Sequence, residues 1–164
     1  MSTVIITKLE PFYQLFLKNH FKSNRLNFEF PRDHDLNTLL SFCKKPTPPG
    51  RKTDDFGDET FEIEFPLQPY DEKVNYYLPE KALILFQQRV IDLYQLEFHS
   101  DMCKLHSDGY LKNDAIIMLI YKYGLPDDEK TIERMKKDFY RWRQRKYNKK
   151  RSKKKQKKST AEAA

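Results

Sequence analysis

The chain has 164 residues, including nine prolines and only four glycines, so it is long enough for one domain with a real core and is no fibrous repeat. Its formal net charge of +7 at pH 7 is unevenly divided. Residues 134–158 hold fifteen Lys and Arg and one acid, whereas residues 1–133 hold sixteen Lys and Arg and twenty-two Asp and Glu. No apolar run approaches the roughly 18 residues that cross a bilayer, and we expect no signal peptide. Cys43 and Cys103 lack CxxC spacing, which indicates reduced thiols in a cytoplasmic protein.

Short elements are predicted in the first part of the chain. Val4–Leu9 is mildly β-branched and indicates a short strand or an extended arm. An apolar stripe that starts with a proline predicts a helix over Pro11–Phe21. Asn27–Phe30 alternates polar and aromatic residues and suggests a strand, and Asp35 is the expected N-cap of a helix over Leu36–Cys43.

The composition changes over residues 44–58, where prolines, glycines and charges leave almost nothing to bury. This stretch predicts an exposed, mobile loop. Thr60–Pro66 then alternates aromatic or aliphatic residues with glutamates, which predicts a strand with one buried and one solvated face. The pattern leaves open whether this strand pairs with Val4–Leu9 or with Asn27–Phe30.

Three helices are predicted in the second half. The first begins at Leu78–Glu80 and extends to about Leu105, and its many apolar residues predict burial on more than half of its circumference. A short apolar helix over Asn113–Tyr123 ends at Gly124. Acids then begin a last helix over Glu129–Asn148. The apolar stripe of this helix, which we expect to face inward, consists of Ile132, Met135, Phe139 and Trp142.

These elements predict a mainly α protein, a small helical bundle with a minor N-terminal β element. Residues 111–148 have the proportions of a helix-turn-helix, in which a buried helix positions a second one for the major groove. We expect one domain over residues 1–148. Residues 149–164 have nothing to bury, so they are expected to form a disordered, lysine-rich tail.

The outer face of the last helix and the tail carry the side chains that nucleic-acid-binding proteins use. Arg recognises guanine, Gln and Asn recognise adenine, and Lys reaches phosphates. Three interpretations stay open: a helix that reads DNA, a helix that contacts RNA or phosphate without sequence choice, and a merely solvated face. The predicted nucleic-acid-binding residues are Arg134, Lys137, Arg141, Gln144, Arg145, Asn148, Lys149, Lys150, Arg151, Lys153, Lys154, Lys155, Lys157 and Lys158.

Aromatic residues lie among these basic side chains. Tyr140 and Tyr147 could stack on unpaired bases. Trp142 falls on the apolar stripe, which favours core packing for this side chain.

One group of residues has ligand types that zinc accepts. His99, Cys103 and His106 share one helix face, but three ligands without a second cysteine pair are more typical of packing and capping. We therefore predict no metal site and no cofactor. The sequence contains no glycine-rich phosphate loop, no GxSxG and no HExxH, so we predict that the protein is not an enzyme.

Tyr123–Leu125 and Lys136–Arg145 resemble segments of small basic helical proteins that bacterial phages and mobile elements carry. The resemblance covers about Tyr76–Tyr147. It implies a bacterial or viral cytoplasmic setting and a DNA-associated role.

The predicted function is nucleic-acid binding, to duplex DNA more than to RNA. A protein partner for the N-terminal half stays possible, and no membrane is expected. The alternative is a structural component of a virion or other nucleoprotein assembly, whose basic tail contacts nucleic acid or an acidic partner.

Overall fold

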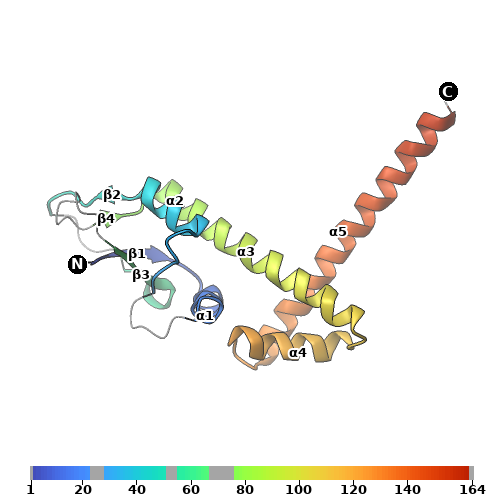
Figure 1. Ribbon diagram of the computed structural model, residues 1–164, viewed down its shortest axis with the longest axis horizontal. Coiled ribbons are helices and arrows are strands. Elements are labelled where there is room, and N and C mark those ends of the chain that lie inside the picture. Colours follow the sequence, from blue (N-terminus) through green and yellow to red (C-terminus); the bar gives the residue numbers. More distant parts are fainter. Residues whose placement is uncertain (1, 23–27, 51–54, 67–75, 163–164) are drawn as a thin grey trace. The chain divides into compact units, whose positions relative to one another are not determined.

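The computed structural model describes the backbone of residues 2–22, 28–50, 55–66 and 76–162, and side chains within 5–22, 28–50, 55–64 and 76–150. The described residues are mainly helical, with 67% of them in helices when the 3₁₀ turn is counted, and they form five α-helices and a small two-stranded sheet near the N-terminus (Figure 1). The predicted mainly helical fold class is therefore confirmed.

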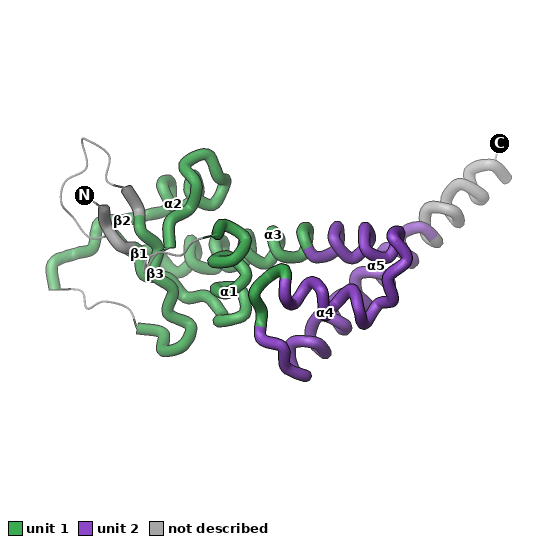
Figure 2. Tube along the Cα trace, turned by 60° about the horizontal axis from the view of Figure 1, so that its bottom comes forward, with its two compact units in different colours: residues 1–97, 122–125 green, residues 98–121, 126–164 purple. Residues whose placement is uncertain are grey.

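The chain divides into two compact units, where the sequence predicted one domain over residues 1–148 (Figure 2). Unit 1 consists of residues 1–97 and 122–125, and unit 2 of residues 98–121 and 126–164. Helix α3, Glu80–Ser107, contributes to both units. Its 28 residues make it about 42 Å long, which exceeds the diameter of a small domain core.

A two-stranded antiparallel sheet forms part of unit 1. Strand β1, Ser2–Lys8, pairs with β3, Thr60–Pro66, and Ile5 lies opposite Ile63. Phe61 and Ile63 are buried while Glu62 is exposed, so the alternation predicted the buried face correctly. Of the two pairings left open, the structure shows the one with the first strand.

The segment predicted as a strand at Asn27–Phe30 contributes only an isolated parallel bridge between Phe28 and Ile63, and residue 27 lies outside the described residues. Likewise, the stretch predicted as a loop over residues 44–58 is partly ordered. Strand β2, Lys45–Pro46, pairs with β4, Tyr76–Tyr77, and Lys44 lies over the ring of Tyr76 at 4.4 Å. A 3₁₀ turn follows at Gly57–Glu59, and residues 51–54 lie outside the described part.

Two short helices cover the apolar centre of unit 1. Helix α1, Pro11–His20, starts with its proline at the first helical position, as predicted. Helix α2, Asp35–Cys43, begins one residue earlier than expected, because the cap is His34 and not Asp35. The His34 Nδ1 atom accepts a hydrogen bond from the Leu36 N–H at 3.2 Å. Burial lowers the pKa of His34, which favours the neutral ring that can accept this bond.

The end of helix α4, Lys112–Tyr123, belongs to unit 1 through an aromatic cluster. The buried ring of Phe16 packs edge-on against Tyr94 at 5.3 Å and against Tyr123 at 5.4 Å. Gly124 follows with φ +63°, the left-handed conformation of a helix-ending glycine, as predicted. The sequence therefore indicated this helix end correctly.

Helix α3 is buried along one stripe only, and the prediction of burial over more than half of its circumference is wrong. The buried residues recur every fourth position and are Phe86, Val90, Tyr94, Phe98 and Met102. Ile84, Leu85 and Leu96 are exposed. A helix that packs on one side buries about one residue per turn, and the other apolar residues then lie in solvent.

The core of unit 2 comes from three helical segments, the end of α3, most of α4 and the start of α5, Glu129–Glu162. The Asp128 carboxylate caps α5, because it accepts the Thr131 N–H at 2.6 Å, and this bond lowers its pKa. The buried side chains of this core are Phe98, Met102, Ala115, Ile116, Leu119, Ile120, Thr131, Met135 and Phe139. The predicted stripe is thus confirmed in part, since Ile132 and Trp142 are half-buried.

Helix α5 extends beyond Asn148, where the sequence predicted the last helix to end. The backbone stays helical through Glu162. Residues 129–162 contain neither proline nor glycine, and Lys, Arg, Gln and Ala have high helix propensity. Propensity therefore continues the helix after the last buried turn.

Candidate nucleic-acid interface

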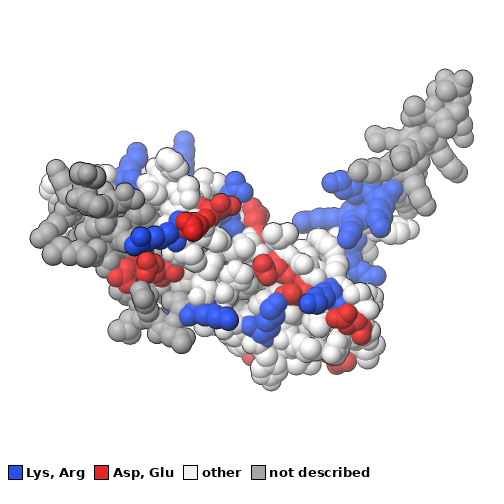
Figure 3. All heavy atoms as spheres, in the orientation of Figure 1, with Lys and Arg blue, Asp and Glu red and all other residues white. Residues whose placement is uncertain are grey.

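The predicted binding residues on α5 are mostly exposed. Lys137, Arg141, Gln144, Arg145, Asn148, Lys149 and Lys150 are exposed. Arg134, which is half-buried, lies at the edge of this group. The side chains of Arg151, Lys153, Lys154, Lys155, Lys157 and Lys158 lie outside the described residues. In Figure 3, Lys and Arg side chains gather on α5 just before its grey end.

Helix geometry gives α5 three faces. At about 100° per residue, the buried face with Met135 and Phe139 lies roughly 120° from the face with Arg141 and Arg145. The third face, at a similar angle from both, carries Tyr140 and Tyr147. We call the face with Arg141 and Arg145 the arginine face, and the face with Tyr140 and Tyr147 the tyrosine face.

The single acid of residues 134–158, Asp138, lies at the border between the arginine face and the buried face, about 20° from Arg145 around the helix. The Asp138 carboxylate is directed toward His99 of α3, with 3.8 Å between Oδ1 and Nε2. His99 also stacks on Trp142, with ring centroids 4.7 Å apart and planes 14° apart. The Asp138 carboxylate therefore faces His99 inside unit 2, and residues 134–158 still hold fifteen Lys and Arg against this one acid.

His99 is not arranged as a metal ligand. Its Nε2 atom is buried and makes no hydrogen bond to the described residues, while Cys103 and His106 are exposed. Burial lowers the pKa of His99, Asp138 partly opposes this, and Arg145 adds to the lowering. Within the described part of the chain, no three His, Cys, Asp or Glu residues are grouped to hold a metal ion.

The lowered pKa of His99 predicts acid sensitivity of unit 2. The unfolded chain, with an ordinary histidine pKa of about 6.5, takes up the proton before the folded protein does. The stability that the neutral ring contributes is therefore complete above that pH and is lost as the pH falls below it. We expect His99→Gln to flatten the dependence of the urea midpoint on pH between pH 7.5 and 5, followed by far-ultraviolet circular dichroism because His99 stacks on Trp142 and would alter its fluorescence.

His106→Gln is the matched control, since His106 is exposed on the same helix. It should retain the pH dependence of the wild type. An equal flattening in both variants would show that the effect does not come from burial of His99.

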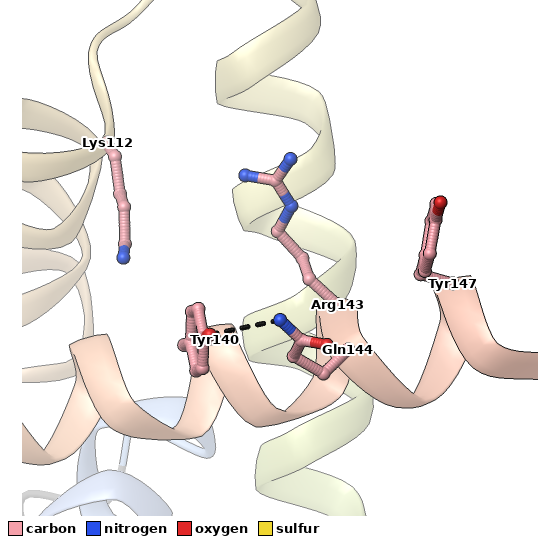
Figure 4. Close-up of a pocket in the computed structure, with 5 residues that line it drawn as sticks. All are labelled: Lys112, Tyr140, Arg143, Gln144 and Tyr147. Atoms are coloured by element: carbon pink, nitrogen blue, oxygen red, sulfur yellow. Dashed lines mark hydrogen bonds between the residues drawn. The ribbon is translucent and has the colours of Figure 1, made fainter.

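An open pocket of about 410 Å³ lies on the tyrosine face (Figure 4). Its described lining consists of Tyr140, Arg143, Gln144 and Tyr147 from α5 and Lys112 from the start of α4. In Figure 4, Arg143 extends from α5 between the two tyrosines, and Lys112 reaches toward Tyr140 from the neighbouring helix. The pocket thus combines two aromatic rings with two cations.

Gln144 belongs to this pocket, although we predicted it as a base-reading residue of the arginine face. Its Nε2 atom donates a hydrogen bond to the Tyr140 hydroxyl at 3.0 Å. Sequence reasoning missed Lys112 and Arg143. The spacing of Tyr140, Arg143 and Tyr147 at i, i+3 and i+7 was the signal for Arg143, whereas nothing local marks Lys112.

A second hollow, of about 500 Å³, lies in unit 1 between α2 and α3. Its lining is mixed and includes His34, Asp35, Leu36, Thr38, Leu39, Phe42, Arg89, Asp92, Leu93 and Leu96. Phe42 is 86% exposed at its edge. A protein partner for the N-terminal half stays a prediction. The exposed apolar side chains of this hollow are a surface on which such a partner would pack.

In comparisons with known proteins, no family model, curated protein or solved structure matches this chain. The resemblance to phage and mobile-element proteins therefore stays a prediction. Within the part of the chain that the structure describes, no helix has the length and apolar character that crossing a membrane requires.

Proposed function

We propose that this chain binds nucleic acid, duplex DNA in preference to RNA, through the arginine face and the lysine-rich continuation of α5. One observation carries the proposal. The exposed bases Lys137, Arg141 and Arg145 share a helix surface, in a stretch, residues 134–158, that holds fifteen Lys and Arg against one acid. A cationic surface of this kind attracts polyanions and releases their counterions.

Duplex DNA is favoured because an exposed α-helix fits the major groove of B-DNA. The deep and narrow major groove of A-form RNA does not admit side chains in the same way. Helix α5 is preceded by the shorter helix α4 and a turn, which is the order found in helix-turn-helix proteins. The cytoplasm of a bacterium, for a protein encoded by the bacterium or by a virus that infects it, is the setting that accords with this proposal.

The direct test is a binding titration of the purified protein on duplex DNA, single-stranded DNA and RNA across a salt series. Tightest binding to duplex, with a steep loss of affinity as salt rises, would support the proposal. The absence of binding to all three at low salt would contradict it.

Two substitutions decide whether the arginine face reads bases. Arg141→Ala or Arg145→Ala should cost about 1–3 kcal/mol on a preferred site obtained by selection from random duplexes. The loss on random DNA should be much smaller, because a base contact gives specificity and a phosphate contact gives affinity everywhere. Neither change opens the core, since both side chains are exposed.

Lys81→Ala, an exposed cation at the start of α3 in unit 1, is the control and should leave binding unchanged. If no preferred site emerges and both arginine variants weaken every duplex equally, the face holds phosphates alone. The alternative function, a structural component of a virion or other nucleoprotein assembly, would then account better for the chain.

A further inference from the structure

We infer that the pocket on the tyrosine face binds unpaired nucleotides of a nucleic-acid strand, with bases on Tyr140 and Tyr147 and phosphates on Arg143 and Lys112. The inference deepens the proposed function and rests on it, because it adds a second kind of contact to the same helix. It concerns a different face of α5 from the one proposed to hold the duplex.

The two tyrosines are available as stacking surfaces. Tyr140 is 58% exposed and Tyr147 is 64% exposed, although aromatic rings of this size are usually buried to a greater extent. The hydrogen bond from Gln144 to the Tyr140 hydroxyl holds one ring in place. A ring that is already ordered loses less side-chain entropy when a base stacks on it.

The cations are placed for phosphates. Arg143 follows Tyr140 by one helical turn and precedes Tyr147 by one turn, so a guanidinium lies between two rings that are about 10 Å apart along the axis. This order suits a base, a linking phosphate and a second base. The Arg143 guanidinium also lies over the ring of Phe139, at 5.9 Å, and among the described residues neither Arg143 nor Lys112 forms an ion pair with an acid.

Lys112 brings the start of α4 to the same pocket. It is the first residue of that helix, where unpaired N–H groups and the helix dipole favour an anion. The volume of about 410 Å³ falls in the range of about 300–1,000 Å³ that small-molecule sites occupy, which is enough for a nucleotide.

The ligand must be unpaired. In a duplex both faces of each base are covered by neighbours in the stack, so a tyrosine ring can reach a base face only in a single strand, a gap or an end. Every base has such a face, so this pocket should discriminate little between sequences.

The test compares the wild type with Tyr140→Ala/Tyr147→Ala on three fluorescently labelled probes: a short DNA single strand, the same sequence as RNA, and its blunt duplex. We expect each lost ring to weaken single-strand binding by about 5- to 150-fold, the equivalent of base–aromatic stacking. Affinity for the blunt duplex should stay within about twofold. The DNA and RNA strands show which sugar the pocket accepts.

Tyr140→Phe/Tyr147→Phe is the matched control, because phenylalanine keeps the ring and should retain most of the single-strand affinity. Equal loss on duplex and single strand, or no loss on either, would overturn the inference while leaving duplex binding intact. A wild type that binds no probe would instead refute the proposed function.

Photo-crosslinking provides a second measurement that needs no variant. An oligonucleotide that carries 5-iodouracil in a single-stranded stretch should crosslink to Tyr140 or Tyr147 in the full-length wild type, as located by mass spectrometry. Crosslinks found only elsewhere on the chain would overturn the inference.

Discussion

Replacing Phe139 by Ala is expected to lower the free energy of unfolding of unit 2 by about 3–5 kcal/mol, the usual cost of a large-to-small change in a core. Phe139 is only 6% exposed. Its ring packs edge-on against Phe98 at 6.3 Å and stacks with Trp142 at 5.7 Å. The substitution removes both ring contacts and leaves a cavity at the centre of the unit.

The effect is measured as the shift of the urea midpoint, followed by far-ultraviolet circular dichroism because the Trp142 signal itself senses Phe139. Tyr140→Ala is the control, since it removes a neighbouring aromatic ring that is mostly exposed and should change stability by less than about 0.5 kcal/mol. Equal midpoints for Phe139→Ala and the wild type would mean that α5 does not pack against α3 in solution.

Deleting residues 149–164 is expected to have the largest effect on binding. The deletion removes eight Lys and Arg and one acid. If all eight bases contact phosphates, the slope of log affinity against log salt should become shallower by up to about 7, at about 0.9 per released counterion. The loss should be alike for all duplex sequences, because counterion release carries no sequence information.

Deleting residues 159–164 alone provides the control. That segment contains no Lys or Arg, so its removal should leave the salt slope unchanged. The Phe139 core should also survive the longer deletion, since its last buried residue lies ten positions before residue 149. A salt slope that is the same with and without residues 149–158 would assign the lysine-rich segment to an acidic protein partner.

Local patterns predicted most of the fold. The period-two alternation at Thr60–Pro66 indicated both the strand and its buried face, because side chains alternate across a sheet. Proline at Pro11 and glycine at Gly124 marked a helix start and a helix end correctly, because proline fixes φ near the helical value and glycine tolerates the positive φ that ends a helix. Pairing partners remained open, because alternation contains no information about the neighbouring strand.

The predictions were wrong where tertiary contacts determine burial, or where two neighbouring residues can both cap a helix. Asp35 and His34 both have side chains that can cap a helix, and the structure uses the histidine. The apolar residues of α3 indicated burial on more than half of its circumference, yet Leu96 is 70% exposed, because the number of apolar residues does not determine how many helices pack around them.

In the candidate site, too, local features could be predicted from the sequence and contacts between helices could not. Exposure of Arg141 and Arg145 followed from their spacing relative to Phe139, which is local information. The direction of Asp138 toward His99 and the arrival of Lys112 beside Tyr140 depend on contacts between helices, and no periodicity in the sequence contains them.

The continuation of α5 through Glu162 sets a linear charge density. Residues 149–158 contain eight Lys and Arg, and ten residues of helix rise about 15 Å, which gives about one positive charge per 1.9 Å. Duplex DNA carries about one negative charge per 1.7 Å of its axis. An extended chain would spread the same charges over more than twice the length. The helical form therefore brings the cations of this segment close to the spacing of the phosphates that they would neutralise.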